Sequence, residues 1–406
     1  MEGDIRSNDN SIEQIDVPTI NFIPQGRRYW FVRTFGGALF DYYYDTGKVG
    51  ILGNTVPIEY IKNAPHNAAT FGSLQGYIHE NMYPENTGEA TKLANQLVDF
   101  YHNMKVNDIV LMPSENSDYI AFGLVTSGFK ERERLRSDTF RHREKELPYP
   151  TKTRTVKWLK IMRKHEVVGD LRNLLISQMG LTKADNYAEF IESNLATFFV
   201  KDNSYYSTLC VDLNEEQELN AFDLYRYLEA LTRLYEDFCY RNNIPYNEAL
   251  FLKIKVQSPG NFIWKIVEEA GKKAGTVGKG IVKGAGAASF IGLSGLIALS
   301  VTGSDPNIEL TKNADGTYDF KAGINGNIWE NIENAKDQEQ NRGTKSQHDS
   351  LDIEDRKFEQ YLKRKAHGVL TEEDRRKYET QLLDSARALN ITTVESKAIA
   401  RRELED

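Results

Sequence analysis

The residue types that perform acid–base or metal chemistry are present in this chain, but their spacing forms no recognisable catalytic site. The 7 histidines are scattered, without an H-E-x-x-H or H-x-H pair that would bind zinc. No G-x-S-x-G sequence offers a serine nucleophile. Gly278–Lys279 is followed by glycine instead of the Ser or Thr of a phosphate-binding loop. We therefore predict no catalytic residues, no metal and no cofactor. An enzyme that uses pairs of Asp and Glu residues is the alternative.

Residues 130–172 carry a marked local excess of positive charge. The whole chain has 51 Lys and Arg against 59 Asp and Glu, a net charge of −8, whereas this stretch holds fourteen basic and seven acidic residues. Such an excess attracts phosphate, while the acidic remainder argues against unspecific coating of nucleic acid. The alternative is that these charges form an ordinary solvated face.

The apolar pattern around the basic stretch predicts a small sheet that would position it. Buried strands are predicted at 29–35 (YWFVRTF), 48–52, 108–113 (DIVLMP), 119–126 (YIAFGLVT) and 153–161 (TRTVKWLKI). A helix is predicted over 88–103 and short helices over 166–200, whereas 55–86 is expected to be a loose connection. The basic residues between 130 and 153 then fall in a loop beside the last strand.

This order of strand, helix, strand pair, basic loop and strand resembles the PUA/EVE-like domain at the N-terminus of Mrr-type restriction proteins. The resemblance covers about residues 25–200, on the motifs YWFVRT, NDIVLMP, YIAFGLVT and TVKWLKI. It implies a small β-barrel with a pocket that accepts a modified or flipped base. One departure is that the family often carries an I-G-W run after its second strand, where this chain reads ILGN.

A pocket of that kind needs an aromatic wall, donors for the base edge and cations for the flanking phosphates. Under the resemblance, the wall comes from Trp30, Tyr119 and Trp158. The edge contacts come from Arg33, Thr34 and Asn54, and the phosphate contacts from Arg141, Arg143, Lys152 and Arg154. The alternative for Trp30 and Trp158 is a place in the barrel core.

A change in sequence character near 200–206 ends this first unit, which we place at 21–203. Residues 204–265 are predicted to form a strand, a helix over 221–241 and a second strand, with helix residues including Phe222, Tyr225 and Phe238 facing inward. The unit resembles the TRADD-N-like adaptor modules of bacterial conflict proteins, which implies oligomerisation; a plain α+β connector is the alternative. The nuclease that usually follows in Mrr-type proteins is expected to be absent, because Glu248, Lys253 and Lys255 do not have its spacing.

Residues 266–303 are the least polar part of the chain, and Gly284–Val301 contains no charged residue. Small residues recur at every fourth position, at Gly280, Gly284, Ala288 and Gly292, the spacing of closely packed membrane helices. Lysines precede the apolar run and acidic residues follow it, which would leave the first 280 residues in the cytoplasm. We predict a membrane-active segment; the alternative is a Gly-rich linker followed by one buried core helix.

The two ends of the chain carry less apolar pattern. Residues 1–20 are expected to be a disordered lead without a secretory signal, and 304–329 a β-hairpin. Residues 330–406 are expected to be a charged linker and a small helical module, with helices at 358–367, 371–388 and 394–403, that binds a partner protein. Cys210 and Cys239 alone make no disulfide framework, which fits a reducing cytosol.

The sequence therefore predicts an α+β multidomain chain: a PUA-like barrel, a strand–helix–strand unit with a Gly-rich apolar helix, and a charged helical tail. The predicted function is a non-enzymatic bacterial anti-phage defence protein, cytoplasmic and associated with the inner membrane on activation. It would sense nucleic acid, with DNA favoured, and act as a homo-oligomer through the Gly-rich segment. The alternative is a soluble nucleic-acid-binding specificity module of a restriction-type system that recruits a separate nuclease. The two differ in whether residues 281–301 contact lipid.

Overall fold

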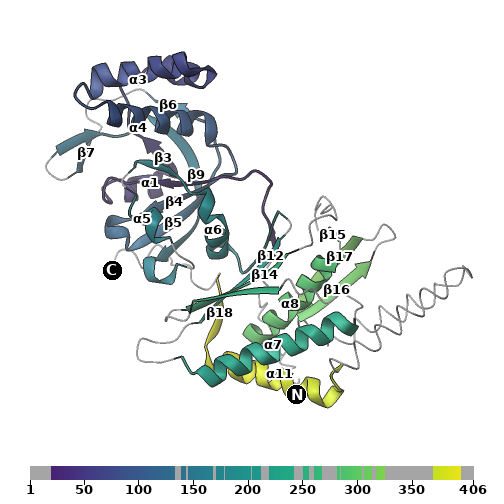
Figure 1. Ribbon diagram of the computed structural model, residues 1–406. Helices are drawn as coiled ribbons and strands as arrows, with labels where there is room; N and C mark the ends of the chain where they lie inside the picture. Colours follow the sequence, from purple (N-terminus) through teal and green to yellow (C-terminus); the bar gives the residue numbers. More distant parts are fainter. Residues whose placement is uncertain are drawn as a thin grey trace, which may run out of the picture.

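The computed structural model of the chain describes residues 20–132, 139–142, 145–167, 171–177, 179–202, 204–211, 219–241, 250–255, 260–267, 281–283, 285–303, 306–312, 317–324 and 369–394. Within these residues the strands form four sheets. The two largest sheets, with the helices that cover them, make two units that lie next to each other in Figure 1. The fold is mixed α+β, as predicted.

The first unit is built on a sheet with the strand order β10-β2-β4-β5-β9-β3. Its strands are β2 (Tyr29–Val32), β3 (Lys48–Ile51), β4 (Ile109–Pro113), β5 (Tyr119–Val125), β9 (Lys152–Arg163) and β10 (Leu181–Lys183), and β6 (Lys130–Glu131) also pairs with β9. β2 and β4 run parallel, and the other pairs are antiparallel. A parallel pair needs a long crossover, which residues 33–108 supply.

This crossover holds the helices that cover one face of the sheet. They are α1 (Phe40–Thr46), α2 (Ile58–Asn63), the 3-10 turn Ala64–His66, α3 (Ala68–Met82), α4 (Thr87–Val98) and the π-helical Asp99–Asn103. The prediction for α4 is confirmed. The loose connection expected over 55–86 is wrong, because α2 and α3 lie there. In α3 only Leu74 and Ile78 are buried, so the helix lacks the apolar stripe that would have announced it.

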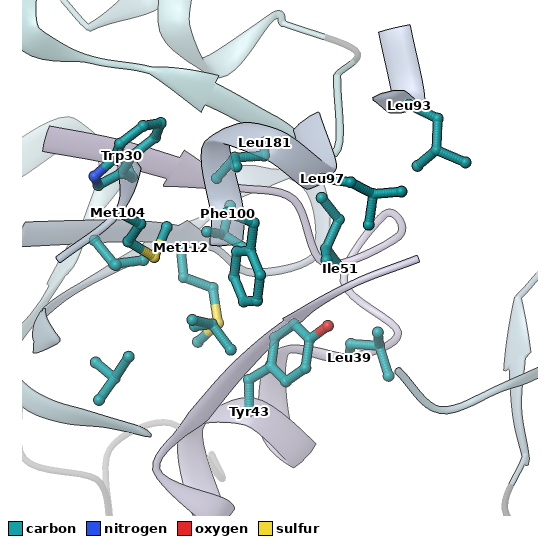
Figure 2. Packing of buried hydrophobic residues seen from close by; sticks show 14 of the residues in the cluster. Trp30, Leu39, Tyr43, Ile51, Leu93, Leu97, Phe100, Met104, Met112 and Leu181 are labelled. Carbon is teal, nitrogen blue, oxygen red and sulfur yellow. The ribbon is translucent and has the colours of Figure 1, made fainter. Parts of the chain in front are cut away.

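The strand β2 is buried on both faces because it lies between two cores. Its alternate residues Trp30 and Val32 face the crossover helices and share a cluster with Tyr43 and Phe100 from those helices and with Met112 of β4 (Figure 2). Tyr29 and Phe31 face the other way, toward α5 (Arg172–Leu175) and α6 (Ala188–Leu195). The run YWFV is therefore apolar throughout instead of alternating.

The second sheet has the order β1-β11-β12-β14-β13, with β18 also beside β12. Its strands are β1 (Ile20–Phe22), β11 (Phe198–Lys201), β12 (Ser204–Val211), β13 (Leu250–Lys255), β14 (Gly260–Val267) and β18 (Ile391–Thr393). Residues from near both ends of the chain thus meet in one sheet. The boundary that we placed at 203/204 falls inside the β11–β12 hairpin, so the two units share a continuous stretch of chain.

Three helices pack on this second sheet: α7 (Ala221–Arg241), α8 (Ala285–Thr302) and α11 (Glu372–Ala388). The bounds of α7 agree with those predicted. Leu231, Leu234 and Phe238 are buried as expected. The inward positions expected for Phe222 and Tyr225 are wrong, because these side chains are 75% and 60% exposed on other sides of the helix, while Leu224 between them packs on the core. The helix predicted at 371–388 is confirmed by α11, whose N-terminus is capped by Thr371, since its Oγ1 accepts the Asp374 N–H at 3.1 Å.

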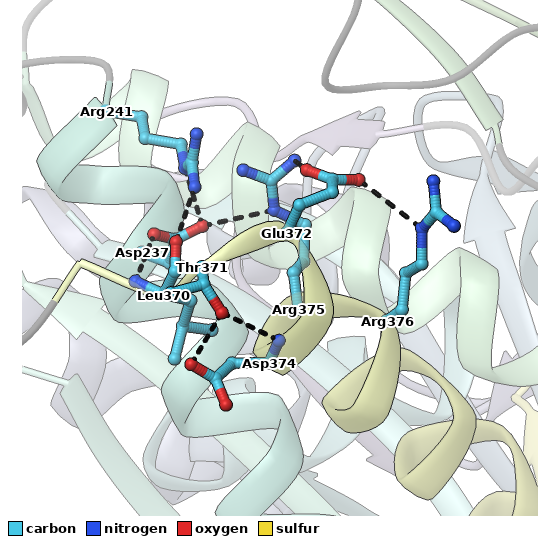
Figure 3. Close-up of polar contacts among 8 residues, drawn as sticks. All are labelled: Asp237, Arg241, Leu370, Thr371, Glu372, Asp374, Arg375 and Arg376. Atoms are coloured by element: carbon cyan, nitrogen blue, oxygen red, sulfur yellow. Dashed lines mark hydrogen bonds and ion pairs between the residues drawn. The ribbon is translucent and has the colours of Figure 1, made fainter.

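A buried polar cluster joins α11 to α7 (Figure 3). Asp237 accepts from Arg241 Nε at 2.8 Å and from the Leu370 N–H at 3.1 Å, and its carboxylate lies 3.4 Å from Arg375 Nε. Leu382 and Ala386 of α11 lie in the same core as α7 and α8. The apolar face of this helix is therefore occupied within the chain, and the predicted binding of a partner protein stays a prediction.

Two smaller sheets complete the described strands. The hairpin β7 (Thr139–His142) and β8 (Lys145–Pro148) projects from the first unit in Figure 1. In the other, β17 (Thr317–Ile324) lies between β15 (Ile281–Lys283) and β16 (Pro306–Lys312), which confirms the predicted hairpin strands. The predicted lead up to residue 19, the linker and the helices at 358–367 and 395–403 lie outside the described residues.

Candidate ligand site

The predicted aromatic wall does not form one surface. Trp30 is fully buried, and its indole Nε1 donates to Asp108 Oδ2 at 2.8 Å. Trp158 is half-buried and stacks on Tyr44, with ring centroids 5.7 Å apart. Tyr119 is half-buried against the same core. These placements favour the core alternative for Trp30, whose ring has no face left for a base.

Two of the predicted edge contacts are used inside the protein. Thr34 is buried, and its hydroxyl donates to the carbonyl of Pro113 at 2.8 Å. The Asn54 side chain joins a turn to the start of β9: Nδ2 donates to the Tyr149 carbonyl and Oδ1 accepts the Thr151 N–H, each at 3.0 Å. Both side chains therefore position backbone instead of pointing to a ligand.

Two of the predicted phosphate contacts are buried cations on β9. Lys152 is fully buried and pairs with Glu131 at 2.8 Å. The guanidinium of Arg154 donates to the carbonyls of Phe100, Ser127 and Tyr101 at 2.8–3.2 Å, and burial lowers its pKa to about 10. Neither can reach a phosphate from solvent. Arg141 is exposed on β7, and Arg143 lies outside the described residues.

Arg33, the third predicted edge contact, lines a large cavity. This cavity has a volume of about 810 Å³ and is bounded by the end of β2, the end of β3, α4, the β7–β8 hairpin and the described residues at 176, 179 and 180. Phe35, Tyr83 and His142 supply rings, and Leu52, Leu93, Ile176 and Met179 supply aliphatic surface. A concave surface of mixed aromatic and apolar side chains with a few polar groups is the usual form of a small-ligand site.

The polar groups of the cavity come mainly from α4. Lys92 and Glu89 form an ion pair at 2.7 Å and remain about half exposed. Gln96 Oε1 accepts the Leu181 N–H at 2.9 Å, an arrangement that leaves its amide NH2 for another acceptor. Arg33 adds positive charge to the lining from the end of β2, although burial lowers its pKa. The site therefore offers donors and positive charge beside its rings.

The backbone at the mouth of the cavity is held in an unusual conformation. Phe35 has φ of 55°, a left-handed value that few large side chains adopt, and Gly36 and Gly37 follow with φ of 66° and 106°. Gly37 is required, because a Cβ there would lie 2.5 Å from Glu115. The turn aims Phe35 at the hairpin, where its ring meets Phe140 at 5.5 Å and His142 at 5.9 Å. Strain of this kind, which costs about 1–3 kcal/mol, gathers at functional sites.

Sequence reasoning missed Phe35, Tyr83, Lys92, Gln96 and His142. The run Phe35-Gly36-Gly37 was read only as a strand end and a turn. Lys92 and Gln96 lie on the polar face of α4. The buried apolar face is enough to predict the helix, so the polar face is expected to be ordinary solvent-exposed surface. The spacing of Lys92 and Gln96, four residues apart, places them on one side of α4, but nothing in the sequence indicates that the residues at 176, 179 and 180 face that side.

The predicted membrane segment is described in part. Gly280 and Gly284 lie outside the described residues, as does the side chain of Ala288 in α8. Gly292 lies against the ring of Phe238 on α7, and Leu293, Leu296 and Ile297 are buried in the core of the second unit. Among the described helices, none is both long enough and apolar enough to cross a membrane. Within the same residues no three His, Cys, Asp or Glu side chains are placed to hold a metal ion.

Comparison with known proteins gives one similarity. Residues 51–183 match the model of a domain of unknown function (DUF8426). The matched stretch runs from the end of β3 through β10, so it includes α4, the β7–β8 hairpin and the loop 176–180, but not Arg33 and Phe35. No curated protein and no solved structure matches the chain.

Proposed function

We propose that the first unit binds nucleic acid and that its cavity receives one unpaired or flipped base. The observation that carries the proposal is the meeting of three aromatic rings with Arg33, Lys92 and Gln96 around one cavity of about 810 Å³. Ligand cavities typically measure roughly 300–1,000 Å³. Rings stack on a base, side-chain donors bond its edge, and cations hold the adjacent phosphates.

The relation to PUA/EVE-like domains is part of this proposal. It is supported by the sheet, in which four of the strands that carry the resemblance are neighbours in the order β2-β4-β5-β9. The cavity lies at the edge of this framework and takes its ligand contacts from α4, the hairpin and loops. The predicted barrel tryptophans, which do not line the cavity, then belong to the core of the unit instead of touching the base.

We further propose that the chain is the non-enzymatic specificity module of a restriction-type defence system and recruits a separate nuclease. The placement of α8 supports this choice over direct action on a membrane. Contact with lipid would require α8 to leave a core in which Phe290, Leu293, Leu296 and Ile297 are buried. Each of these side chains gains roughly 1.5–3 kcal/mol from burial, so its exposure is opposed before any lipid contact forms.

Binding is tested with the full-length protein and labelled single-stranded DNA by fluorescence anisotropy. Tyr83→Leu should weaken binding by about 1–3 kcal/mol through lost stacking, and Lys92→Met should lower the salt dependence by about one phosphate contact. Lys62→Met is a matched control, because Lys62 forms the same i,i+3 pair with a Glu, on α2 and away from the cavity. Wild-type protein that fails to bind at about 10⁻⁴ M, the weak end of non-specific affinity, would refute the proposal.

Action on a membrane is the second candidate, and the uncharged run Gly284–Val301 is the observation in its favour. Full-length protein can be fractionated with membranes, with and without single-stranded DNA. Under the proposal above it stays out of the membrane fraction in both conditions. Transfer to that fraction when DNA is added would establish the second candidate instead. Deletion of 281–301 is not a suitable control, because it removes a core helix.

A further inference from the structure

Ile176 is an aliphatic side chain at the mouth of the cavity that the fold leaves in solvent. It is 71% exposed and follows directly after α5, and it lines the cavity together with Met179, which is 37% exposed. A buried isoleucine contributes roughly 1.5–3 kcal/mol, so its exposure here leaves that stabilisation unused. A single exposed apolar residue is ordinary, but this one also lines the cavity.

The backbone on both sides of Ile176 is fixed by Arg33. The guanidinium donates from Nε to the Ser177 carbonyl at 2.5 Å and from Nη2 to the Leu175 carbonyl at 2.7 Å. These two carbonyls flank Ile176 in the chain. A planar guanidinium presents its donors as a rigid fork, so the two bonds set the direction of the backbone between them.

The far end of the same loop is fixed as well. The Arg33 N–H donates to the Gly180 carbonyl at 2.9 Å, and the Leu181 N–H donates to Gln96 Oε1 at 2.9 Å. Gly180 fits closely here, because a Cβ would lie 2.9 Å from that same Gln96 oxygen. Cavity-lining residues therefore hold the backbone on either side of Ile176 and again at Gly180 and Leu181.

A base that leaves a duplex leaves a gap in the stack of its strand. Extrusion costs a few kcal/mol. Apolar side chains are able to enter a stack of bases, since DNA-bending proteins insert them between base steps. The side chain must be aliphatic, must project from the surface and must lie beside the pocket that takes the base. Ile176 meets each of these conditions.

We propose that Ile176 is a wedge that fills the gap in a DNA duplex when a base enters the cavity, and that Arg33 is the residue that positions it. This proposal rests on the proposed function, because it concerns how a paired base reaches the same cavity. It adds a specific expectation: the wedge acts on duplex DNA and is idle on a single strand, whose bases are already free.

The test compares two probes on the full-length protein, a single-stranded DNA and the matching duplex with one 2-aminopurine. Ile176→Ser should weaken duplex binding by about tenfold, equivalent to 1.4 kcal/mol, and abolish the rise in 2-aminopurine fluorescence that marks unstacking. Binding to the single strand should weaken clearly less than binding to the duplex, because there Ile176 contributes only as one of the residues that line the cavity. Ile176→Leu keeps an aliphatic wedge and should retain most of the duplex affinity.

Two further variants test whether the position of Ile176 matters, or only the presence of an exposed apolar side chain. Arg33→Lys replaces the fork with a single ammonium group, so it should lower the ratio of duplex to single-strand affinity in the same direction as Ile176→Ser. Val106→Ser is the matched control, since Val106 is 47% exposed in the same unit but does not line the cavity. It should change neither affinity.

The outcomes distinguish this inference from the proposed function. Wild-type protein that binds neither probe refutes the proposed function. Wild-type protein that binds both probes while Ile176→Ser leaves duplex affinity and fluorescence unchanged overturns the wedge alone. An equal loss on both probes also overturns it, because Ile176 would then contact the strand itself.

Discussion

Gly292→Ala tests whether the glycine row of α8 serves packing inside the protein. A Cβ at position 292 would lie 2.1 Å from Phe238 Cε1 and 2.2 Å from Cδ1, far inside van der Waals contact. Phe238 is buried in the shared core, so its ring cannot turn into solvent. Overpacking of this kind costs about 1–3 kcal/mol, whereas Ala in place of Gly within a helix gains about 1 kcal/mol.

Because a contact of 2.1 Å cannot be relieved by a small shift, the steric cost should exceed the gain in helix propensity. We expect a net loss of about 1–2 kcal/mol in the free energy of unfolding of the second unit. The same chemical change at Gly76, in the middle of α3, meets nothing within 4 Å. Only the propensity applies there, so Gly76→Ala should stabilise the first unit by about 0.5–1 kcal/mol.

Thiol labelling in urea measures the second unit selectively. The sequence has 2 cysteines, Cys210 and Cys239, and both are buried in that unit. Gly292→Ala should lower the urea concentration at which they become reactive, and Gly76→Ala should not. Phe238→Leu should cost less in the Gly292→Ala background than alone, since the smaller side chain relieves the clash.

Unchanged or improved thiol protection in Gly292→Ala would refute this reasoning. It would mean that α8 does not press against Phe238, and the small-residue spacing would then need another partner, such as a second helix in a membrane. A loss in both single variants with no coupling between positions 292 and 238 would also contradict it, because contact predicts coupling.

Two further predictions concern the same core. Burial raises the pKa of Cys239 to about 12, so the folded chain holds this proton more tightly than the unfolded chain, in which the thiol titrates near ~8.5. The contribution of this thiol to the free energy of unfolding is complete below about pH 8.5. It is lost as pH rises, by up to about 1.4 kcal/mol per pH unit. Cys239→Ala should therefore make the alkaline loss of stability shallower, as measured by urea titrations at pH 8 and 10. Asp237→Asn should cost about 3–5 kcal/mol because it leaves Arg241 and Arg375 facing each other without a carboxylate, whereas Arg375→Met should cost less, since Asp237 keeps Arg241 and the Leu370 N–H. Equal losses in these two variants would contradict the description of Asp237 as the shared centre.

The elements that the sequence predicted correctly are those whose pattern has a single physical cause. The helices α4 and α7 each bury one stripe, and β4, β5 and β9 are long apolar or alternating runs. The helices α2 and α3 bury few side chains, so periodicity had little to detect. The membership of β1 and β18 in the second sheet was beyond sequence reasoning, because strand pairing across most of the chain depends on tertiary packing.

The candidate site was harder to predict than the fold because composition does not show where a charged side chain points. The excess of basic residues in 130–172 predicted cations that face solvent, yet Lys152, Arg154 and Lys160 on β9 are all buried. Arg154 is satisfied by backbone carbonyls that lie far from it in sequence. By contrast Lys92, which does line the cavity, lies outside the basic stretch, so a local count of positive charge does not find it. A charge count therefore indicates that cations exist, and the fold decides which of them a ligand can reach.

The same reasoning applies to the row of small residues that ends at Gly292: the sequence shows the spacing, and the fold decides what packs against it. Small residues at every fourth position allow any flat partner to approach a helix closely, and lipid-embedded helices are only one such partner. In this chain the ring of Phe238 takes that place against Gly292, and the hydroxyls of Ser289 and Ser300 bond to Tyr235 and Tyr227 on the same helix. Ser300 also donates to the carbonyl of Ile297 in its own helix at 2.7 Å, so its contact with Tyr227 is additional to a bond that the helix itself supplies. The paired hydroxyls and the Gly292 contact together indicate that α8 is shaped to fit α7.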